Sequence, residues 1–162
     1  MKFVLVIFIV LFVQKSNAAE LNVKGGDIRT FNVPVDCKSC MFGAKVKILK
    51  LNDTDPKWAA STGLVLHGAK KERATIGLVY FGEKRGLTSI VNSFNELGEP
   101  TTLKTIKSNL KYNVEYEIDI FWGENRNVLF KVTGVESIFD IGFKPIRAEF
   151  IVSGMQLEFV SK

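Results

Sequence analysis

The sequence contains little of what most catalytic and metal sites need, because its 162 residues include a single histidine, His67. Metal centres gather several histidine, cysteine or carboxylate ligands, so one histidine gives metal catalysis little support. A Ser-His-Asp site needs a nucleophile elbow such as GxSxG, and no such pentapeptide occurs. A glycine-rich phosphate loop leading into a helix is also absent. We therefore expect no metal, no cofactor and no catalysis.

The chain also lacks an apolar run long enough to cross a bilayer. Its longest apolar stretch, Phe3 to Val13, is shorter than the about 20 residues that a membrane-spanning helix needs. Lys2 precedes this stretch and small residues follow it, which is the pattern of a secretory signal. We expect a signal peptide over residues 1–18, one domain over residues 19–162, a secreted, extracellular protein and no membrane insertion.

Basic residues form no block, although the chain has 22 Lys and Arg against 17 Asp and Glu and a formal net charge of +5. They are scattered in pairs such as Lys70–Lys71 and Lys84–Arg85. A small positive charge favours solubility and attraction to anionic surfaces. It does not indicate nucleic acid, and we expect no nucleic-acid partner.

Cysteine is scarce, and the two cysteines, Cys37 and Cys40, form a CxxC pair. Such a pair can be a redox motif, half of a zinc site or a short disulfide. A redox pair normally begins a helix, and no helical period follows Cys40. A disulfide is the default for an exported chain. Asn52 opens an Asn-Asp-Thr sequon, so we also predict it as a glycosylation site.

What the sequence does contain is period-two alternation of apolar and polar residues, rich in β-branched and aromatic side chains. Segments bounded by Gly, Asn, Asp and Pro predict strands at 46–51, 63–67, 75–81, 87–92, 114–121, 127–133 and 148–160. Short strands at this spacing, with no long amphipathic helix between them, indicate an all-β antiparallel sandwich or barrel. The 13 phenylalanines suit the inner faces of a two-sheet core.

One segment, EYEIDIFWGE, resembles the start of the catalytic strand of jelly-roll β-glucanases. Alternation places Glu115, Glu117 and Asp119 on one face of a strand. Retaining glycoside hydrolysis needs a second carboxyl group about 5–5.5 Å from the first. The β-glucanase pattern has that glutamate two or three positions after the aspartate, where this chain has Phe121 and Trp122. A charged solvent face explains the segment better, and a hydrolase is the less favoured alternative.

Taken in order, the strands resemble the galectins, a family of jelly-roll sandwiches (galectin/concanavalin-A-like) that bind β-galactosides. FGAKVKILKL looks like the strand before the sugar-binding face, GLVLHGAKK like the L-H-x-N-P-R strand, and TSIVNS like the V-x-N-S strand. LKYNVEYEIDIFWGENRNVLFKVTG and IRAEFIVSGMQLEFV resemble the later strands. The resemblance runs from about residue 26 to residue 160 and implies a galectin-like carbohydrate-recognition domain.

On the first binding strand, the resemblance implies that His67 matches the family's histidine. The asparagine and arginine positions of the motif fall on Ala69 and Lys71. Lysine offers a mobile point charge where arginine has a rigid fork of donors. Alternation also places Arg73 on the same face, so Arg73 could replace the arginine if the register shifts by two residues.

The other binding positions are partly changed. Asn92 matches the second asparagine, whereas the tryptophan position falls on Leu97, which lacks a π-system for the sugar ring. Glu99 is expected to replace the glutamate that orients the cation. Trp58 and Trp122 are expected to pack in the core or against loops.

We therefore expect a divergent, secreted galectin-like lectin whose partners are glycans or glycoproteins. Its candidate carbohydrate-binding residues are His67, Lys71, Arg73, Asn92 and Glu99. The alternative is a protein with the same fold that has lost sugar binding and serves as an interaction module.

Overall fold

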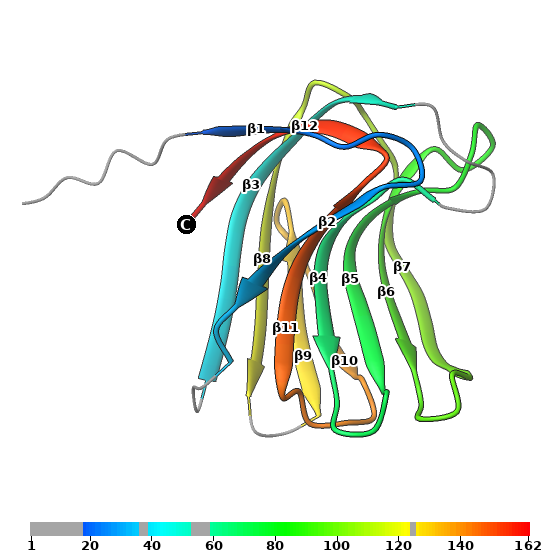
Figure 1. Ribbon diagram of the computed structural model, residues 1–162, viewed down its shortest axis with the longest axis vertical. Helices are drawn as coiled ribbons and strands as arrows, with labels where there is room; N and C mark the ends of the chain where they lie inside the picture. Colours follow the sequence, from blue (N-terminus) through cyan, green and yellow to red (C-terminus); the bar gives the residue numbers. More distant parts are fainter. Residues whose placement is uncertain (1–17, 36–38, 53–58, 124–125) are drawn as a thin grey trace, which may run out of the picture.

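The computed structural model describes residues 18–35, 39–52, 59–123 and 126–162. They form two six-stranded antiparallel sheets: sheet A, in the order β1-β12-β3-β8-β9-β10, and sheet B, in the order β2-β11-β4-β5-β6-β7 (Figure 1). The strands are β1 (Ala19–Asn22), β2 (Ile28–Val33), β3 (Ser39–Leu51), β4 (Ser61–His67), β5 (Arg73–Tyr80), β6 (Leu87–Phe94), β7 (Pro100–Leu110), β8 (Glu115–Gly123), β9 (Asn127–Val132), β10 (Val135–Asp140), β11 (Arg147–Ser153) and β12 (Met155–Ser161). The predicted all-β sandwich is confirmed. Among the described residues no helix is long and apolar enough to span a membrane.

The core lies between the two sheets and follows from the alternation of each strand. Successive side chains point to opposite faces, so every second residue of an inner strand is buried. Ile118 and Ile120 of sheet A meet Leu64 and Leu66 of sheet B in one apolar cluster. Burying one such side chain contributes about 1.5–3 kcal/mol. Trp122 is 3% exposed and belongs to this cluster, as expected, whereas Trp58 lies outside the described residues.

Each of the seven predicted strands overlaps a described strand, but the last prediction needs correction. The segment 148–160 is not one strand, because it is divided at Gly154. Gly154 has a φ of +60°, a backbone region that strongly favours glycine. The chain changes sheet here, with β11 in sheet B and β12 in sheet A.

Four strands, β1, β2, β7 and β10, were not predicted. They are the edge strands of the two sheets. Their side chains are mostly exposed on both faces, so no buried face imposes a period-two hydrophobic pattern. Strand prediction from hydrophobic alternation therefore finds the inner strands and misses the edges.

Two glycines face each other in the middle of sheet B, Gly63 on β4 and Gly77 on β5. A Cβ atom on Gly63 would lie 2.3 Å from the carbonyl oxygen of Ile76, and one on Gly77 would lie 2.2 Å from that of Thr62. Neither position has room for a side chain. The glycine pair therefore allows a close approach of the two strand backbones.

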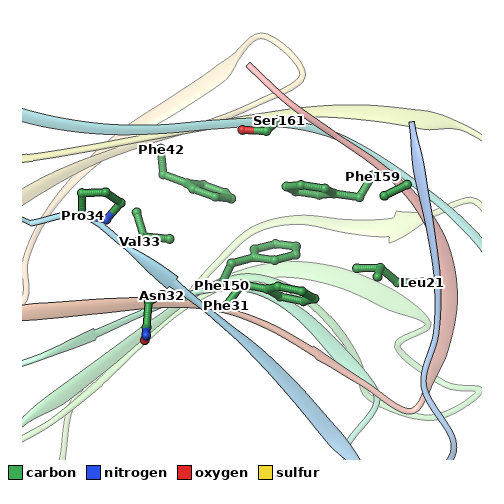
Figure 2. A pocket seen from close by; sticks show the side chains of 10 residues that line it. Leu21, Phe31, Asn32, Val33, Pro34, Phe42, Phe150, Phe159 and Ser161 are labelled. Carbon is green, nitrogen blue, oxygen red and sulfur yellow. The ribbon is translucent and has the colours of Figure 1, made fainter. Parts of the chain in front are cut away.

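One edge of the sandwich opens into an apolar cleft of about 350 Å³ lined by residues of β1, β2, β3, β11 and β12. Figure 2 shows Phe42 and Phe159 of sheet A facing Phe150 and Phe31 of sheet B. The ring centroids of Phe42 and Phe150 are 5.3 Å apart, and those of Phe150 and Phe159 are 4.7 Å apart. These rings join the two sheets at this edge.

We predict that Phe150→Ala lowers the free energy of unfolding by about 3–5 kcal/mol, because it removes a ring that is 2% exposed from between the sheets. Phe31→Ala is the matched control, since its ring is 42% exposed, and should cost less than half as much. Urea denaturation of both variants measures the difference. Equal losses would contradict the view that Phe150 joins the sheets.

Candidate functional site

Cross-strand pairing brings polar residues from distant parts of the chain together on the outer face of sheet B, the face that points away from sheet A. His67 pairs with Arg147 on one side and with Arg73 on the other. We call this line of residues, at the end of the sheet where the β4–β5 turn lies, the rim row: Arg147, His67, Arg73 and Phe94. The next line is the second row: Glu149, Val65, Thr75 and Asn92.

The orientation of these rows follows from the neighbouring residues. Leu66, Ala74 and Ala148 alternate with the rim-row residues along their strands, and all three are fully buried in the core cluster. The rim-row side chains must therefore point away from sheet A. Arrows of β4 and β6 in Figure 1 end at the lower edge of the sheet, where the rim row lies.

His67 is oriented by a carboxylate from β11. Its Nε2 atom lies 3.0 Å from Oε2 of Glu149, and the side chains are 24% and 19% exposed. A carboxylate only accepts hydrogen bonds, so Nε2 carries the proton and donates it. The Nη2 atom of Arg147 lies 3.4 Å from the same nitrogen and 3.8 Å from Glu149 Oε2. The bond to Glu149 thus holds the imidazole ring of His67 from the neighbouring strand.

Arg73 lies beside His67 through strand pairing rather than along one strand. Its guanidinium carbon lies 4.7 Å from the centroid of the Phe94 ring, a cation–π contact within the rim row. The sequence prediction that Arg73 and His67 share a face agrees with this arrangement. The pairing register, not a shift along β4, brings them together.

Asn92 lies on the same outer face but does not adjoin His67. It pairs with Thr75 of β5, so one strand separates it from β4. Neighbouring strands are about 4.8 Å apart. The site therefore extends over three strands, with Thr75 between the two residues that the sequence prediction combined.

Lys71 lies off the sheet, whereas the resemblance of GLVLHGAKK to a single family strand implied that it faces the site. Strand β4 ends at His67, and the backbone N–H of Gly68 donates to the carbonyl of Glu72 across 2.9 Å. Lys71 is exposed in this turn with a φ of +71°. Strand β5 begins at Arg73, so the turn between the two strands is tight. Lys71 lies in this turn and is not part of a strand that carries the rim row.

Glu99 also has a different partner from the one expected. In the β6–β7 turn, the amide nitrogen of Asn95 donates to the Glu99 carboxylate across 2.8 Å. The Asn95 side-chain oxygen accepts from the backbone N–H of Leu97 across 3.0 Å, as in an Asx turn, and from that of Glu99 across 2.9 Å. Leu97, at the same turn, is 77% exposed. The carboxylate that contacts His67 and Arg147 is Glu149 instead.

Arg147 and Glu149 were not found by sequence reasoning. The alternation in RAEFIVS does signal an outward charged face, because Ala148, Phe150 and Val152 are the buried apolar residues of β11. It does not reveal that this face lies beside His67, 80 residues away in the sequence. That contact depends on the pairing of β11 with β4.

The middle of the outer face is closed to ligands. Val65, Val79 and Ile90 are 9%, 7% and 5% exposed, although they are not part of the core cluster. The apolar cleft is lined by none of the five predicted binding residues. Near the β4–β5 turn, the exposed or partly exposed polar side chains of β4, β5 and β6 on this face therefore lie at the rim row and at Thr75 and Asn92.

The acidic strand lies on the other sheet, where its side chains form ion pairs. Lys45 Nζ lies 3.0 Å from Glu115, and Lys162 binds both Glu117 and Asp119, the latter at 2.9 Å. The hydrogen bond from Lys162, followed by its charge, lowers the pKa of Glu117. Among the described residues, no group of three or more His, Cys, Asp or Glu side chains could hold a metal ion.

The structure describes only part of the two remaining sequence motifs, the CxxC pair and the Asn52 sequon. Cys40 is disulfide-bonded, and Cys37 lies outside the described residues, so their pairing stays a prediction. The Asn52 amide nitrogen donates to the Asn22 side chain across 2.8 Å and to the Val23 carbonyl across 2.6 Å. A glycan attached to this nitrogen would replace one of its two N–H groups. Glycosylation therefore competes with these contacts and stays a prediction.

We predict that Lys162→Met raises the pKa of Glu117 toward its ordinary value, because the hydrogen bond and the charge that lower it are lost. A carboxyl group with a lowered pKa in the folded state stabilises the fold above its ordinary pKa. That contribution is lost as the pH falls through the lowered value. NMR titration of the Glu117 carboxyl carbon measures the change. Lys45→Met, whose charge acts only weakly on Glu117, should shift it less, and an unchanged titration in Lys162→Met would contradict the assignment.

The fold, but not the sequence, matches known proteins. No protein-family model and no curated protein sequence matches the chain. Galectin LEC-6 of Caenorhabditis elegans aligns at 9% identity with a TM-score of 0.59, covering 88% of this chain and 95% of its own. The carbohydrate-binding module CBM66 from Bacillus subtilis aligns at 9% identity with a TM-score of 0.56, covering 90% and 88%. A point variant of human galectin-16 aligns at 13% identity with a TM-score of 0.56, covering 83% and 94%. The protein therefore has the galectin fold, a β-sandwich that it shares with galectins and with a carbohydrate-binding module.

Proposed function

We propose that the protein is a secreted, non-catalytic lectin that binds a β-galactoside or a related glycan at the rim of the outer face of sheet B. The observation that carries the proposal is the line of partly exposed polar side chains that strand pairing builds there, on a fold used by carbohydrate-binding proteins. His67, Arg73 and Asn92 were expected at a binding face from the sequence. All three lie on the outer face of sheet B.

Each residue offers a distinct hydrogen-bonding group to a sugar. His67 presents Nδ1 as an acceptor, because Nε2 donates to Glu149. Arg73 presents several N–H donors, and Asn92 presents both a donor and an acceptor. The Thr75 hydroxyl lies between Arg73 and Asn92 in the paired strands. This mixture suits the hydroxyl groups of a sugar, which both donate and accept.

We expect the affinity for one neutral sugar to be low. A neutral hydrogen bond contributes about 0.5–1.5 kcal/mol net. Three or four such bonds on an open surface give about 4 kcal/mol, which corresponds to a dissociation constant of about 1 mM. Arg73 lies over one face of the Phe94 ring, so that face is not available to stack on a sugar.

The arrangement of carboxylates supports binding without hydrolysis. Glycoside hydrolysis uses two carboxyl groups flanking the bond. At the described outer-face positions of β2, β11, β4, β5 and β6, Glu149 is the single carboxylate, and it is bound by His67. The acidic residues of β8 lie on the opposite sheet and bind lysines.

A second candidate function is an interaction module without sugar binding. Lys71 lies in a turn, and Glu99 is bound to Asn95, so two of the five predicted binding residues do not join the rim row. Leu97 and Leu103 are 77% and 68% exposed, which a protein partner could cover.

We predict that the folded protein binds glycans on an array. Titration calorimetry with the best ligand should show that His67→Ala and Asn92→Ala each weaken binding about tenfold, because each removes a ligand hydrogen bond near the upper end of the neutral range. Lys84→Ala is the control, since Lys84 lies in the β5–β6 turn at the opposite end of the sheet.

An array without any binding, obtained with correctly folded protein, would contradict the lectin proposal and favour the interaction module. Release of reducing sugar from a bound glycan would contradict the non-catalytic proposal.

We also predict that eukaryotic cells expressing the full chain release a protein whose first residue is Ala19. The physical reason is the short apolar run followed by small residues. N-terminal sequencing and intact-mass measurement of the medium test this. Retention of the complete chain inside the cells would contradict it.

A further inference from the structure

The outer face of sheet B carries an excess of positive charge at its accessible end. Among the described outer-face positions of β2, β11, β4, β5 and β6, Arg147 and Arg73 are the cations that are always charged, and Glu149 is the single carboxylate. Both arginines lie in the rim row, with His67 between them. On the strands themselves, a ligand at the rim row therefore meets two fixed cations and one carboxylate.

The two arginines differ in what already neutralises them. Arg147 lies 3.8 Å from Glu149, which also binds His67 at 3.0 Å. Arg73 takes part in no ion pair among the described residues and contacts the Phe94 ring instead. An aromatic ring orients a guanidinium without neutralising its charge. Arg73 is therefore a positioned cation that lacks a carboxylate partner in the described structure.

The geometry of Arg73 suits an oxyanion. The guanidinium carbon of Arg73 lies over the Phe94 ring, a contact that uses the charge of the group rather than its N–H donors. The N–H donors of a guanidinium form two parallel bonds with a carboxylate or a similar anion. Arg73 is exposed. An anion can therefore bind to it while the rest of the anion stays hydrated.

Neutral polar groups lie next to this cation. Thr75 follows Arg73 by two residues on the same face of β5, and Asn92 pairs with Thr75 on β6. An acidic sugar could place its anionic group on Arg73 and its hydroxyl groups on the second row. Arg147 has a side chain that is 60% exposed and adds positive potential from the other side of His67.

We propose that this site selects acidic glycans, those bearing a carboxylate or a sulfate, and that Arg73 binds the anionic group. This inference rests on the proposed lectin function and names the ligand class of the same site. Arg73 sets the preference for acidic over neutral sugars, while His67 and Asn92 contact hydroxyl groups common to both.

The test compares three matched glycans, lactose, 3′-sialyllactose and 3′-sulfolactose, by titration calorimetry at low and at physiological salt. The wild-type protein should bind at least one acidic glycan about tenfold more tightly than lactose, because charge-assisted hydrogen bonds are stronger than neutral ones. The preference should shrink as salt rises. The better acidic ligand identifies carboxylate or sulfate as the favoured group.

Three variants assign the preference to a residue. Arg73→Ala should weaken binding of the preferred acidic glycan about tenfold more than it weakens binding of lactose, so that the preference is lost, and Arg73→Lys should restore part of it, since lysine keeps the charge but not the fork. Arg85→Ala is the matched control, because Arg85 is exposed in the β5–β6 turn at the far end of the sheet. Backbone NMR spectra confirm that each variant is folded.

Each outcome decides between the proposals. Equal binding of all three glycans by the wild-type protein overturns the acidic preference and leaves the lectin proposal standing. An acidic preference that persists in Arg73→Ala overturns the role of Arg73. Absence of binding to any glycan by the folded wild-type protein overturns both proposals.

Discussion

The pairing of β11 between β2 and β4 is the constraint on which the rest of the structure depends. Strand β11 comes late in the chain, yet it fills the gap between two strands from its first half. At Gly154 the chain crosses to sheet A, where β12 pairs between β1 and β3. One continuous segment thus completes both sheets. The same pairing brings Glu149 and Arg147 to His67, so the candidate site exists only when β11 is in register.

The fold was predictable where one face of a strand is buried. On β5, Ile76 and Leu78 are fully buried and alternate with residues of the outer face, and this alternation is visible in the sequence. On β7 most side chains are exposed, and the segment carries no such signal. The edge strands are held by hydrogen bonds to their neighbours rather than by a buried face. Their pairing depends on the assembled sheet, which the local sequence does not encode.

The site was predictable in part for the same reason. Alternation suggested that Arg73 shares the face of His67, and the family resemblance implied the same for Asn92. Strand pairing does bring all three to the outer face of sheet B. Turn geometry was the source of the differences, since the tight β4–β5 turn takes Lys71 off the sheet and the Asn95 side chain binds Glu99. Spacing within a family motif cannot show such contacts. A long-range partner such as Glu149 can be predicted only when the order of the strands in the sheet is known.

The central claim is that glycans bind at the rim of sheet B, and chemical-shift mapping with isotope-labelled protein tests it most directly. On addition of a glycan found by array screening, the account predicts that backbone signals of His67, Arg73, Thr75 and Asn92 shift together. Signals of Glu117 on β8 and of the cleft residue Leu21 on β1 should stay unchanged, because both residues belong to sheet A. Shifts confined to the cleft or to β8, with the rim row unaffected, would contradict the account.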